Sequence, residues 1–296
     1  MSHAVEVFHL SKSFQGNPAV KDISFTVDKG EVVGLVGPNG AGKSVTMRML
    51  AGLIVPDSGQ FALNGNLDPF SSSVLPSVSY LSQTQDFPKD TSLESLMGLC
   101  RHLSPEWDFE LEAELLKRFP LPAKAQASQC SVGQKLQISL VCALSQRSDV
   151  ILLDEPGGNL DPLARSTLNT ALALAMDSYK PAVLIATHLL QSLERLVDRV
   201  LFISKGRLIH SLGADELSEN YRRVSISFPS EVPAEFSLQD AIGAAVDGRT
   251  YTAILRCAIP EQLHSTCSAY GAKWTLFPVS LEQLFIELNK SEDAAT

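Results

Sequence analysis

Short apolar segments recur along the first 212 residues of the chain, and segments with helical spacing separate them. Three of the apolar segments lack a polar face: EVVGLV at residues 31–36, VILLD at residues 150–154 and AVLIAT at residues 182–187. Unbroken apolar runs of this length are typical of strands inside a parallel sheet that helices cover on both faces. Further strands are predicted from Val5 and from Ile23. This alternation of strands and helices predicts an α/β fold.

The strand pattern stops between about residues 86 and 148. There the segments SLESLMGLC and FELEAELLKRF have helical spacing, and prolines mark the breaks between segments. We interpret this stretch as a helical insertion. The strand pattern then returns and ends with VLFIS and RLIH, at residues 200–204 and 207–210, which predict a hairpin. Gly206 supplies the turn between them.

A different pattern begins after Gly213 and predicts a small α+β domain over residues 214–296. Its predicted strands are VSISF at 224–228, TYTAILR at 250–256 and KWTLF at 273–277. Its predicted helices are LQDAIGAAV at 238–246, EQLHSTCSAY at 261–270 and SLEQLFIELNK at 280–290. Residues 291–296 are expected to form a frayed tail.

Composition and charge narrow the class of protein. Apolar residues make up 45% of the chain and charged residues 19%, which is a globular balance. The formal net charge of −9 argues against a general nucleic-acid binder. No run of about 20 apolar residues and no secretory signal is present, so we expect a cytoplasmic protein that does not itself span a membrane. The five cysteines lack a C-x-x-C pair, which favours free thiols.

A glycine-rich loop follows the first of the buried strands and precedes a helical segment. The sequence GPNGAGKS matches the phosphate-binding pattern G-x-x-x-x-G-K-[ST]. Glycines let successive backbone N–H groups turn toward phosphate oxygens, and the following helix points its positive end at the same anion. Lys43 is expected to reach the β- and γ-phosphates, and Ser44 to bind magnesium. The residues expected to hold the nucleotide here are Gly37, Pro38, Asn39, Gly40, Ala41, Gly42, Lys43, Ser44 and Val45.

An acidic pair, Asp154 and Glu155, follows the second buried strand. The carboxyl end of a strand in an open parallel sheet is where ligands bind, so Asp154 is expected to hold magnesium directly or through water. Glu155 is then placed to polarise the attacking water as general base. Taken alone, such a pair could equally cap the helix that follows. The phosphate loop upstream favours the catalytic interpretation.

The segment SVGQK, at residues 131–135, narrows the class further. It resembles the signature sequence of the ABC ATPase family, with Val132 where the commonest form has glycine. A serine hydroxyl and backbone N–H groups at a helix N-terminus can bind a γ-phosphate. The resemblance implies that Ser131, Gly133 and Gln134 bind the nucleotide of a partner chain, because they cannot reach their own. An ordinary serine N-cap is the alternative.

Four single residues complete the resemblance to the ABC ATPase family. Gln83 is similar to the glutamine that touches magnesium and the attacking water while contacting the membrane subunits, and Gln85 is the competing candidate. His188 resembles the switch histidine that contacts the γ-phosphate. Asp161 matches the aspartate of the loop that crosses the dimer interface, unless it only caps a helix. Phe14 lies where the family stacks an aromatic ring on adenine, unless it belongs to the core.

The resemblance covers about residues 3–213 and implies an ABC ATPase core with a mixed sheet and a helical subdomain. It implies ATP and Mg²⁺ as cofactors, with Ser44, Gln83 and Asp154 as metal ligands and with Lys43, Gln83, Glu155 and His188 in catalysis. The substitution of Val132 and the glycine pair Gly157–Gly158 depart from the family pattern and leave the details of the signature contact open.

A single set of motifs implies a dimer, in which two chains close around two Mg-ATP and drive integral membrane permease subunits. The chain is then a peripheral protein at the cytoplasmic face of the cell membrane. The segment SLEQLFIEL is similar to the end of ATP-binding subunits of bacterial drug and antibiotic-peptide exporters, so export is the leading interpretation. An importer subunit and a soluble ABC ATPase of translation or DNA repair are the alternatives. A third treats the C-terminal domain as a sensor that uses Cys257 and Cys267.

Overall fold

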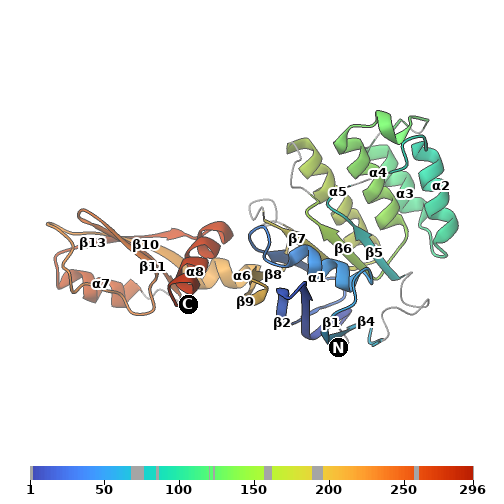
Figure 1. Ribbon diagram of the computed structural model, residues 1–296. Coiled ribbons are helices and arrows are strands. Elements are labelled where there is room, and N and C mark those ends of the chain that lie inside the picture. The colour runs from blue at the N-terminus through green and yellow to red at the C-terminus, as the bar shows by residue number, and fades with distance from the viewer. Residues whose placement is uncertain are drawn as a thin grey trace. The chain divides into compact units, whose positions relative to one another are not determined.

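The computed structural model describes residues 3–67, 77–84, 87–119, 121–122, 124–156, 162–188, 196–256 and 260–295 (Figure 1). The chain divides into two compact units between Ser211 and Leu212, near the change of pattern after Gly213. Each unit has a sheet and a hydrophobic core of its own.

A six-stranded sheet forms the centre of the first unit. Its strands lie in the order β5 (Val78–Leu81), β6 (Val150–Asp154), β7 (Ala182–Thr187), β3 (Val32–Val36), β8 (Arg199–Ser204) and β9 (Arg207–Gly213). The strands from β5 to β8 pair in parallel. Every residue of β3, β6 and β7 is buried, which confirms the parallel strands predicted from the apolar runs. β8 and β9 are neighbours joined by the Lys205-Gly206 turn, as the hairpin pattern predicts.

A three-stranded antiparallel sheet completes the mixed architecture. Its order is β2 (Asn17–Val27), β1 (Val5–Phe14) and β4 (Ser58–Leu63). The hydrophobic pattern had not singled out β4. One continuous core joins this sheet to the six-stranded sheet and to helix α1 (Lys43–Leu50), whose Met47 and Met49 are fully buried. The helix that starts with the phosphate loop is therefore anchored between the two sheets.

The predicted helical insertion consists of α2 (Leu93–Leu103), α3 (Phe109–Arg118), the short 3₁₀ turn Ala127–Gln129 and α4 (Val132–Ser145). Helix α4 packs against α2, α3, α5 (Pro162–Ser178) and β5. Figure 1 shows these helices grouped together. A buried Glu112 accepts hydrogen bonds from Arg101 and from the indole N–H of Trp107, so the charge inside this bundle is paired.

Two cysteines that are far apart in the sequence meet between α2 and α4. Cys100 is partly exposed and Cys142 is buried; both are free thiols, and their side chains hydrogen bond. This hydrogen bond lowers the pKa of Cys100 to about 7 and raises that of Cys142. Near neutral pH, Cys100 is therefore the better nucleophile, because the thiolate is the reactive form.

We expect the rate at which iodoacetamide alkylates Cys100 to rise steeply around pH 7 and not around the higher pH at which an ordinary thiol ionises. In Cys142→Ala the hydrogen bond is lost, and the midpoint of the rate profile should move up toward that of a free thiol. Site-resolved mass spectrometry measures both profiles, with Cys130→Ala as the control. Identical midpoints in wild type and Cys142→Ala would contradict the assignment.

In its described residues, the second unit consists of a four-stranded antiparallel sheet and three helices. The strand order is β11 (Ile242–Asp247), β12 (Thr250–Arg256), β10 (Tyr221–Ser227) and β13 (Lys273–Pro278). The helices are α6 (Ala214–Asn220), α7 (Pro260–Ser268) and α8 (Leu281–Ala295). Ser280 and Gln283 bond reciprocally at the start of α8, which explains why SLEQ begins a helix. Edge-to-face contacts of Phe228 and Tyr251 with Phe236 lie in the core.

Two predictions for this unit are wrong. Residues 238–246 do not form a helix, because Ile242–Asp247 is strand β11 and pairs with β12. Gly243 has φ +61, which a right-handed helix excludes, and a Cβ there would overlap the Glu287 side chain of α8. Pairing with β12 and the close approach of α8 at Gly243 together decide the local structure. The last helix is also longer than predicted, since it continues to Ala295 where a frayed tail was expected.

Candidate active site

The phosphate loop is shaped by glycines that have no room for a side chain. A Cβ on Gly37 would lie 2.1 Å from the carbonyl oxygen of Ile203, and one on Gly42 would lie 2.5 Å from that of Ala19. Gly42 has φ +105 and is the N-cap of α1, where no side chain caps the helix. The N–H groups of the first helical turn therefore face the loop without a competing side-chain acceptor, and this arrangement suits an anion.

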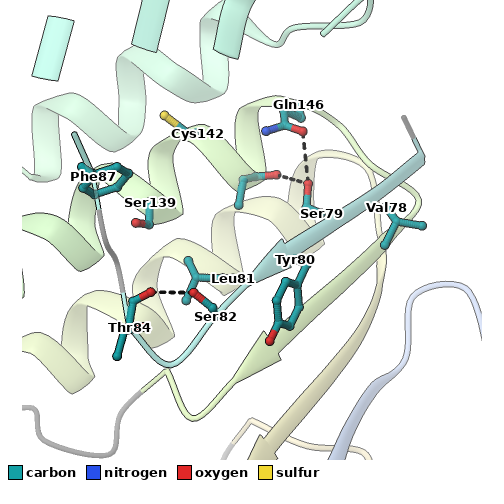
Figure 2. Close-up of a pocket in the computed structure, with 11 residues that line it drawn as sticks. Val78, Ser79, Tyr80, Leu81, Ser82, Thr84, Phe87, Ser139, Cys142 and Gln146 are labelled. Carbon is teal, nitrogen blue, oxygen red and sulfur yellow. Dashed lines mark hydrogen bonds between the residues drawn. The ribbon is translucent and has the colours of Figure 1, made fainter. Parts of the chain in front are cut away.

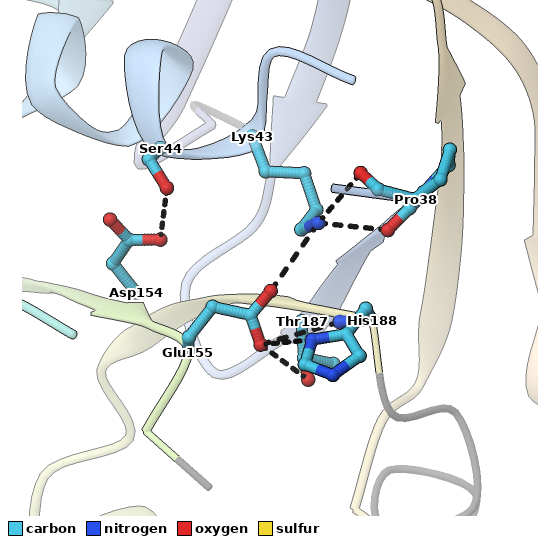
Figure 3. Close-up of polar contacts among 8 residues, drawn as sticks. Pro38, Lys43, Ser44, Asp154, Glu155, Thr187 and His188 are labelled. Carbon is cyan, nitrogen blue, oxygen red and sulfur yellow. Dashed lines mark hydrogen bonds and ion pairs between the residues drawn. The ribbon is translucent and has the colours of Figure 1, made fainter. Parts of the chain in front are cut away.

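Lys43 is buried, with 5% of its surface exposed, and its ammonium group lies at the centre of the site. It donates to the carbonyl oxygens of Gly37 at 2.8 Å and Pro38 at 3.1 Å. It also forms an ion pair with Oε1 of Glu155 at 3.3 Å (Figure 3). A cation held by the loop itself is placed to meet a phosphate that enters the loop.

Asp154 and Ser44 come from neighbouring elements and meet at the end of β6. The Ser44 hydroxyl donates to Oδ1 of Asp154 at 2.9 Å, and the Tyr80 hydroxyl donates to Oδ2 at 3.1 Å. Burial raises the pKa of Asp154, while the hydrogen bonds from Ser44 and Tyr80 lower it in part. Desolvation is the main cause because only 1% of Asp154 is exposed.

Glu155 is held by the neighbouring strand β7. Its Oε2 accepts hydrogen bonds from the Thr187 hydroxyl at 3.1 Å and from the backbone N–H of His188 at 3.4 Å, and Nδ1 of His188 lies 2.9 Å away (Figure 3). Glu155 also has φ +50, a conformation that non-glycine residues rarely adopt. The strand order β6–β7–β3 brings Glu155, His188 and the phosphate loop to the same edge of the sheet.

A cavity of about 540 Å³ opens onto this edge. Its lining consists of Ala19, Asn39, Gly40, Gly42, Lys43, Ser44, Val45, Gln83 and Glu155. The cavity thus joins most of the phosphate loop to the general-base candidate and to Gln83; Gln85 lies outside the described residues. The oxygen ligands that Mg²⁺ prefers are available from Ser44 and Asp154, so the donor set fits magnesium beside bound phosphates.

Four other predicted residues, Phe14, Ser131, Gly133 and Gln134, do not line this cavity. Ser131 caps α4: its hydroxyl accepts from the N–H of Gln134, whose side chain accepts from the N–H of Ser131. Gly133 has only the Ser131 hydroxyl within 4 Å of a Cβ position. Phe14 is 45% exposed at the end of β1, with the Lys12 ammonium 5.6 Å from its ring centre, so it is no core residue. Asp161 lies outside the described residues.

The sequence did not single out three residues of the site. Thr187 binds the Glu155 carboxylate, Tyr80 binds Asp154, and Ala19 lines the cavity. Tyr80 precedes Gln83 in the segment SYLSQ, and Thr187 precedes His188, so both lie beside residues that were predicted. No motif pattern singles out either hydroxyl.

A profile of the ABC transporter family matches residues 20–158, which include the phosphate loop, the start of α4 and the Asp154–Glu155 pair. With relatives that match over nearly the whole chain, this shows that the chain belongs to the ABC transporter family as an ATP-binding subunit. Nod factor export ATP-binding protein I of Burkholderia lata is 32% identical over 97% of each chain. ABC transporter ATP-binding protein YtrB of Bacillus subtilis is 29% identical over 95% of this chain and 97% of its own.

Solved structures agree with this assignment. The structure of an ATP binding subunit of an ABC transporter has a TM-score of 0.66 and 28% identity, over 72% of this chain and 91% of the other. The structure of cbiO1 from Clostridium perfringens has a TM-score of 0.63 at 23% identity, over 73% and 91% of the two chains, and shows the fold alone. In the ranges that the structure describes, no helix is both long and apolar enough to cross a membrane.

Proposed function

We propose that this chain hydrolyses ATP at the edge of β3, β6 and β7 and that the hydrolysis drives a membrane exporter. The observation that carries the proposal is the cluster in which the buried Glu155 contacts the buried Lys43 and Thr187 and the exposed His188, close to Ser44 and Asp154. A carboxylate held beside a phosphate loop can take the proton of a water molecule as that water attacks the γ-phosphate.

Positioning and charge neutralisation account for most of the proposed rate enhancement. The γ-phosphate enters the loop, and Lys43 exchanges its contact with Glu155 for the phosphate oxygens. Glu155 keeps its contacts with Thr187 and His188 and so stays oriented toward the attacking water. His188 then contacts the γ-phosphate, and Gln83 reaches the water from the other side of the cavity. Phe14 stacks on the adenine ring.

Magnesium, when bound, neutralises charge on the β- and γ-phosphates. Ser44 and Asp154, whose oxygens are hydrogen bonded to each other, would hold it, and Gln83, which lines the same cavity as Ser44, would be a further ligand. The chain's contribution is to fix these oxygens before the nucleotide arrives. Asp154 is already held on both carboxylate oxygens.

The active form in this proposal is a dimer. Ser131, Gly133 and Gln134 lie at the N-terminus of α4 and do not line the phosphate cavity of their own chain. They therefore serve the γ-phosphate bound by a second copy, and Asp161 contacts that copy across the interface. Hydrolysis removes the shared phosphate contact, so the two copies separate and give the membrane partner a two-state motion.

Export is favoured because several relatives that cover nearly the whole chain are named for Nod factor export. We place the chain at the cytoplasmic face of the cell membrane, attached to permease subunits. Residues 1–213 serve as the ATPase domain, and residues 214–296 serve as an accessory domain. Recognition of the exported molecule is assigned to the membrane subunits.

A second cavity marks the proposed contact with the permease. It has a volume of about 560 Å³ and lies between β5 and α4, where Ser82 and Thr84 flank Gln83 (Figure 2). Ser139, Cys142 and Phe87 also line it. A permease segment docked here would touch the strand that leads to Gln83, so docking and catalysis would share one element.

Co-purification with a candidate membrane permease subunit tests the proposal. The wild-type chain should be recovered with that protein from detergent-solubilised membranes, and Ser139→Trp, which fills the β5–α4 cavity, should lose most of this recovery. His210→Trp places the same bulk in a different cavity of the same unit and should bind normally. A wild-type chain that remains alone when the membrane protein is present would contradict the transporter assignment.

A further inference from the structure

Tyr80 has a place in the site that neither the motifs nor the family assignment gives it. Its hydroxyl donates to Oδ2 of Asp154 at 3.1 Å. Burial raises the pKa of Tyr80, and the nearby Arg48 side chain lowers it in part. Arg48 is on α1, Tyr80 on β5 and Asp154 at the end of β6. These three side chains therefore connect the phosphate-loop helix with the two strands beside it.

The position of Tyr80 follows from the pairing of β5. Ser79 and Tyr80 point to opposite sides of the strand (Figure 2). Ser79 is buried, donates to the carbonyl oxygen of Ala143 at 3.0 Å and lies 2.8 Å from the Ser148 hydroxyl, which fixes the strand against the helical side. Because side chains alternate along a strand, Tyr80 is directed toward the active-site side. The parallel pairing of β5 with β6 brings it beside Asp154.

The two partners of Tyr80 fix the direction of its hydroxyl proton. A guanidinium can only donate hydrogen bonds, and an ionised carboxylate can only accept them. The phenol proton therefore points to Oδ2 of Asp154 and not toward Arg48. Oδ1, which now accepts from Ser44, is left as the oxygen that can turn to a metal ion. The Tyr80 hydroxyl holds one oxygen of the carboxylate in place. The carboxylate therefore loses little further freedom when its second oxygen binds an ion.

We propose that Arg48 and Tyr80 are a positioning pair that orients Asp154 for the divalent metal ion. This inference rests on the proposed metal-binding function of Asp154 and extends it to two residues that do not touch the metal. Since β5 leads directly to Gln83, the same pair connects the segment that contains Gln83 with the proposed metal ligand Asp154.

Mn²⁺ binding measured by electron paramagnetic resonance, in the presence of a non-hydrolysable ATP analogue, tests the pair. Tyr80→Phe removes only the hydroxyl, and we expect the Kd for Mn²⁺ to rise about tenfold, the effect of losing one hydrogen bond to a charged group. Binding of the analogue without metal should be unchanged. Tyr179→Phe is the matched control, because Tyr179 donates to the carbonyl oxygen of Leu144 and is not among the residues that line the phosphate cavity.

Arg48→Gln provides the second variant, at an exposed position where the fold tolerates the change. It should weaken Mn²⁺ binding in the wild-type background and have no further effect in Tyr80→Phe. An unchanged Mn²⁺ affinity in Tyr80→Phe, while Asp154→Asn loses Mn²⁺, overturns the positioning pair and leaves the proposed function intact. An unchanged affinity in Asp154→Asn instead refutes the metal role of Asp154 and the inference with it.

Discussion

Glu155→Gln should lower ATP turnover by at least about 100-fold, which is the usual scale for loss of a general base. The amide keeps an oxygen that can accept from the Thr187 hydroxyl, so the side chain keeps its place on β7. It loses the charge that pairs with Lys43 and cannot accept the proton of the attacking water. ATP binding should survive, because the phosphate loop and Ser44 are untouched. ATP should then hold the two copies together, since hydrolysis no longer releases them.

Phosphate release gives the turnover, and light scattering with ATP gives the dimer fraction. Glu114→Gln on α3 is the matched control, since the partly exposed Glu114 pairs only with Arg118 in the described structure. Its turnover should equal that of the wild type. Hydrolysis at the wild-type rate in Glu155→Gln would remove Glu155 from the role of general base.

Lys43→Ala is the second change with a large expected effect. Among the described residues, the Lys43 ammonium group is the only side-chain cation that lines the cavity, and removing it should weaken ATP binding by about 100-fold. The change also leaves the buried carboxylate of Glu155 without its cation. We therefore expect the nucleotide-free protein to lose about 3 kcal/mol of unfolding free energy.

A double-mutant cycle separates these two consequences. Lys43→Ala/Glu155→Gln has no unpaired buried charge in this pair, so part of the lost unfolding free energy should return. The affinity for ATP should stay low in the double variant, because the phosphate still lacks its cation. Thermal denaturation measures the first quantity and fluorescence titration with a labelled ATP measures the second. Strictly additive stability changes would contradict the Lys43–Glu155 ion pair.

The parts of the site that were predictable from the sequence are those whose chemistry lies within one short segment. The turn from Gly37 to Ser44 needs glycine at positions where a Cβ would strike Ile203 or Ala19. The spacing of these glycines is therefore recognisable from the sequence alone. The strand preceding Asp154 is apolar on both faces because it is buried on both faces. Steric and burial constraints that act within one short segment produce a recognisable pattern in the sequence of that segment.

The contacts that complete the site arise from strand order, which a linear pattern does not contain. Thr187 reaches Glu155 only because β7 lies beside β6, and Tyr80 reaches Asp154 only because β5 lies on the other side of β6. The wrong helix at residues 238–246 has a related cause. Its apolar spacing allows a helix, but pairing with β12 and the close packing of α8 on Gly243 override that local preference.

The central claim is that each ATP is held by the phosphate loop of one copy and the signature residues of another. Two variants, each in the Glu155→Gln background, test it. Lys43→Ala disables the loop, and Gly133→Asp places a negative charge at the N-terminus of α4, where there is room for it and where a phosphate would be repelled. Gly133→Ala, which adds no charge, is the matched control and should behave like Glu155→Gln alone.

Each disabling variant alone should remain monomeric with ATP. When the two are mixed with different affinity tags, one site of a mixed dimer combines an intact loop with an intact signature. Pull-down on one tag should therefore recover the other chain only when ATP is present, with a single ATP retained per mixed dimer. The account is contradicted if no mixed dimers form, or if Gly133→Asp alone dimerises with ATP as fully as Glu155→Gln does.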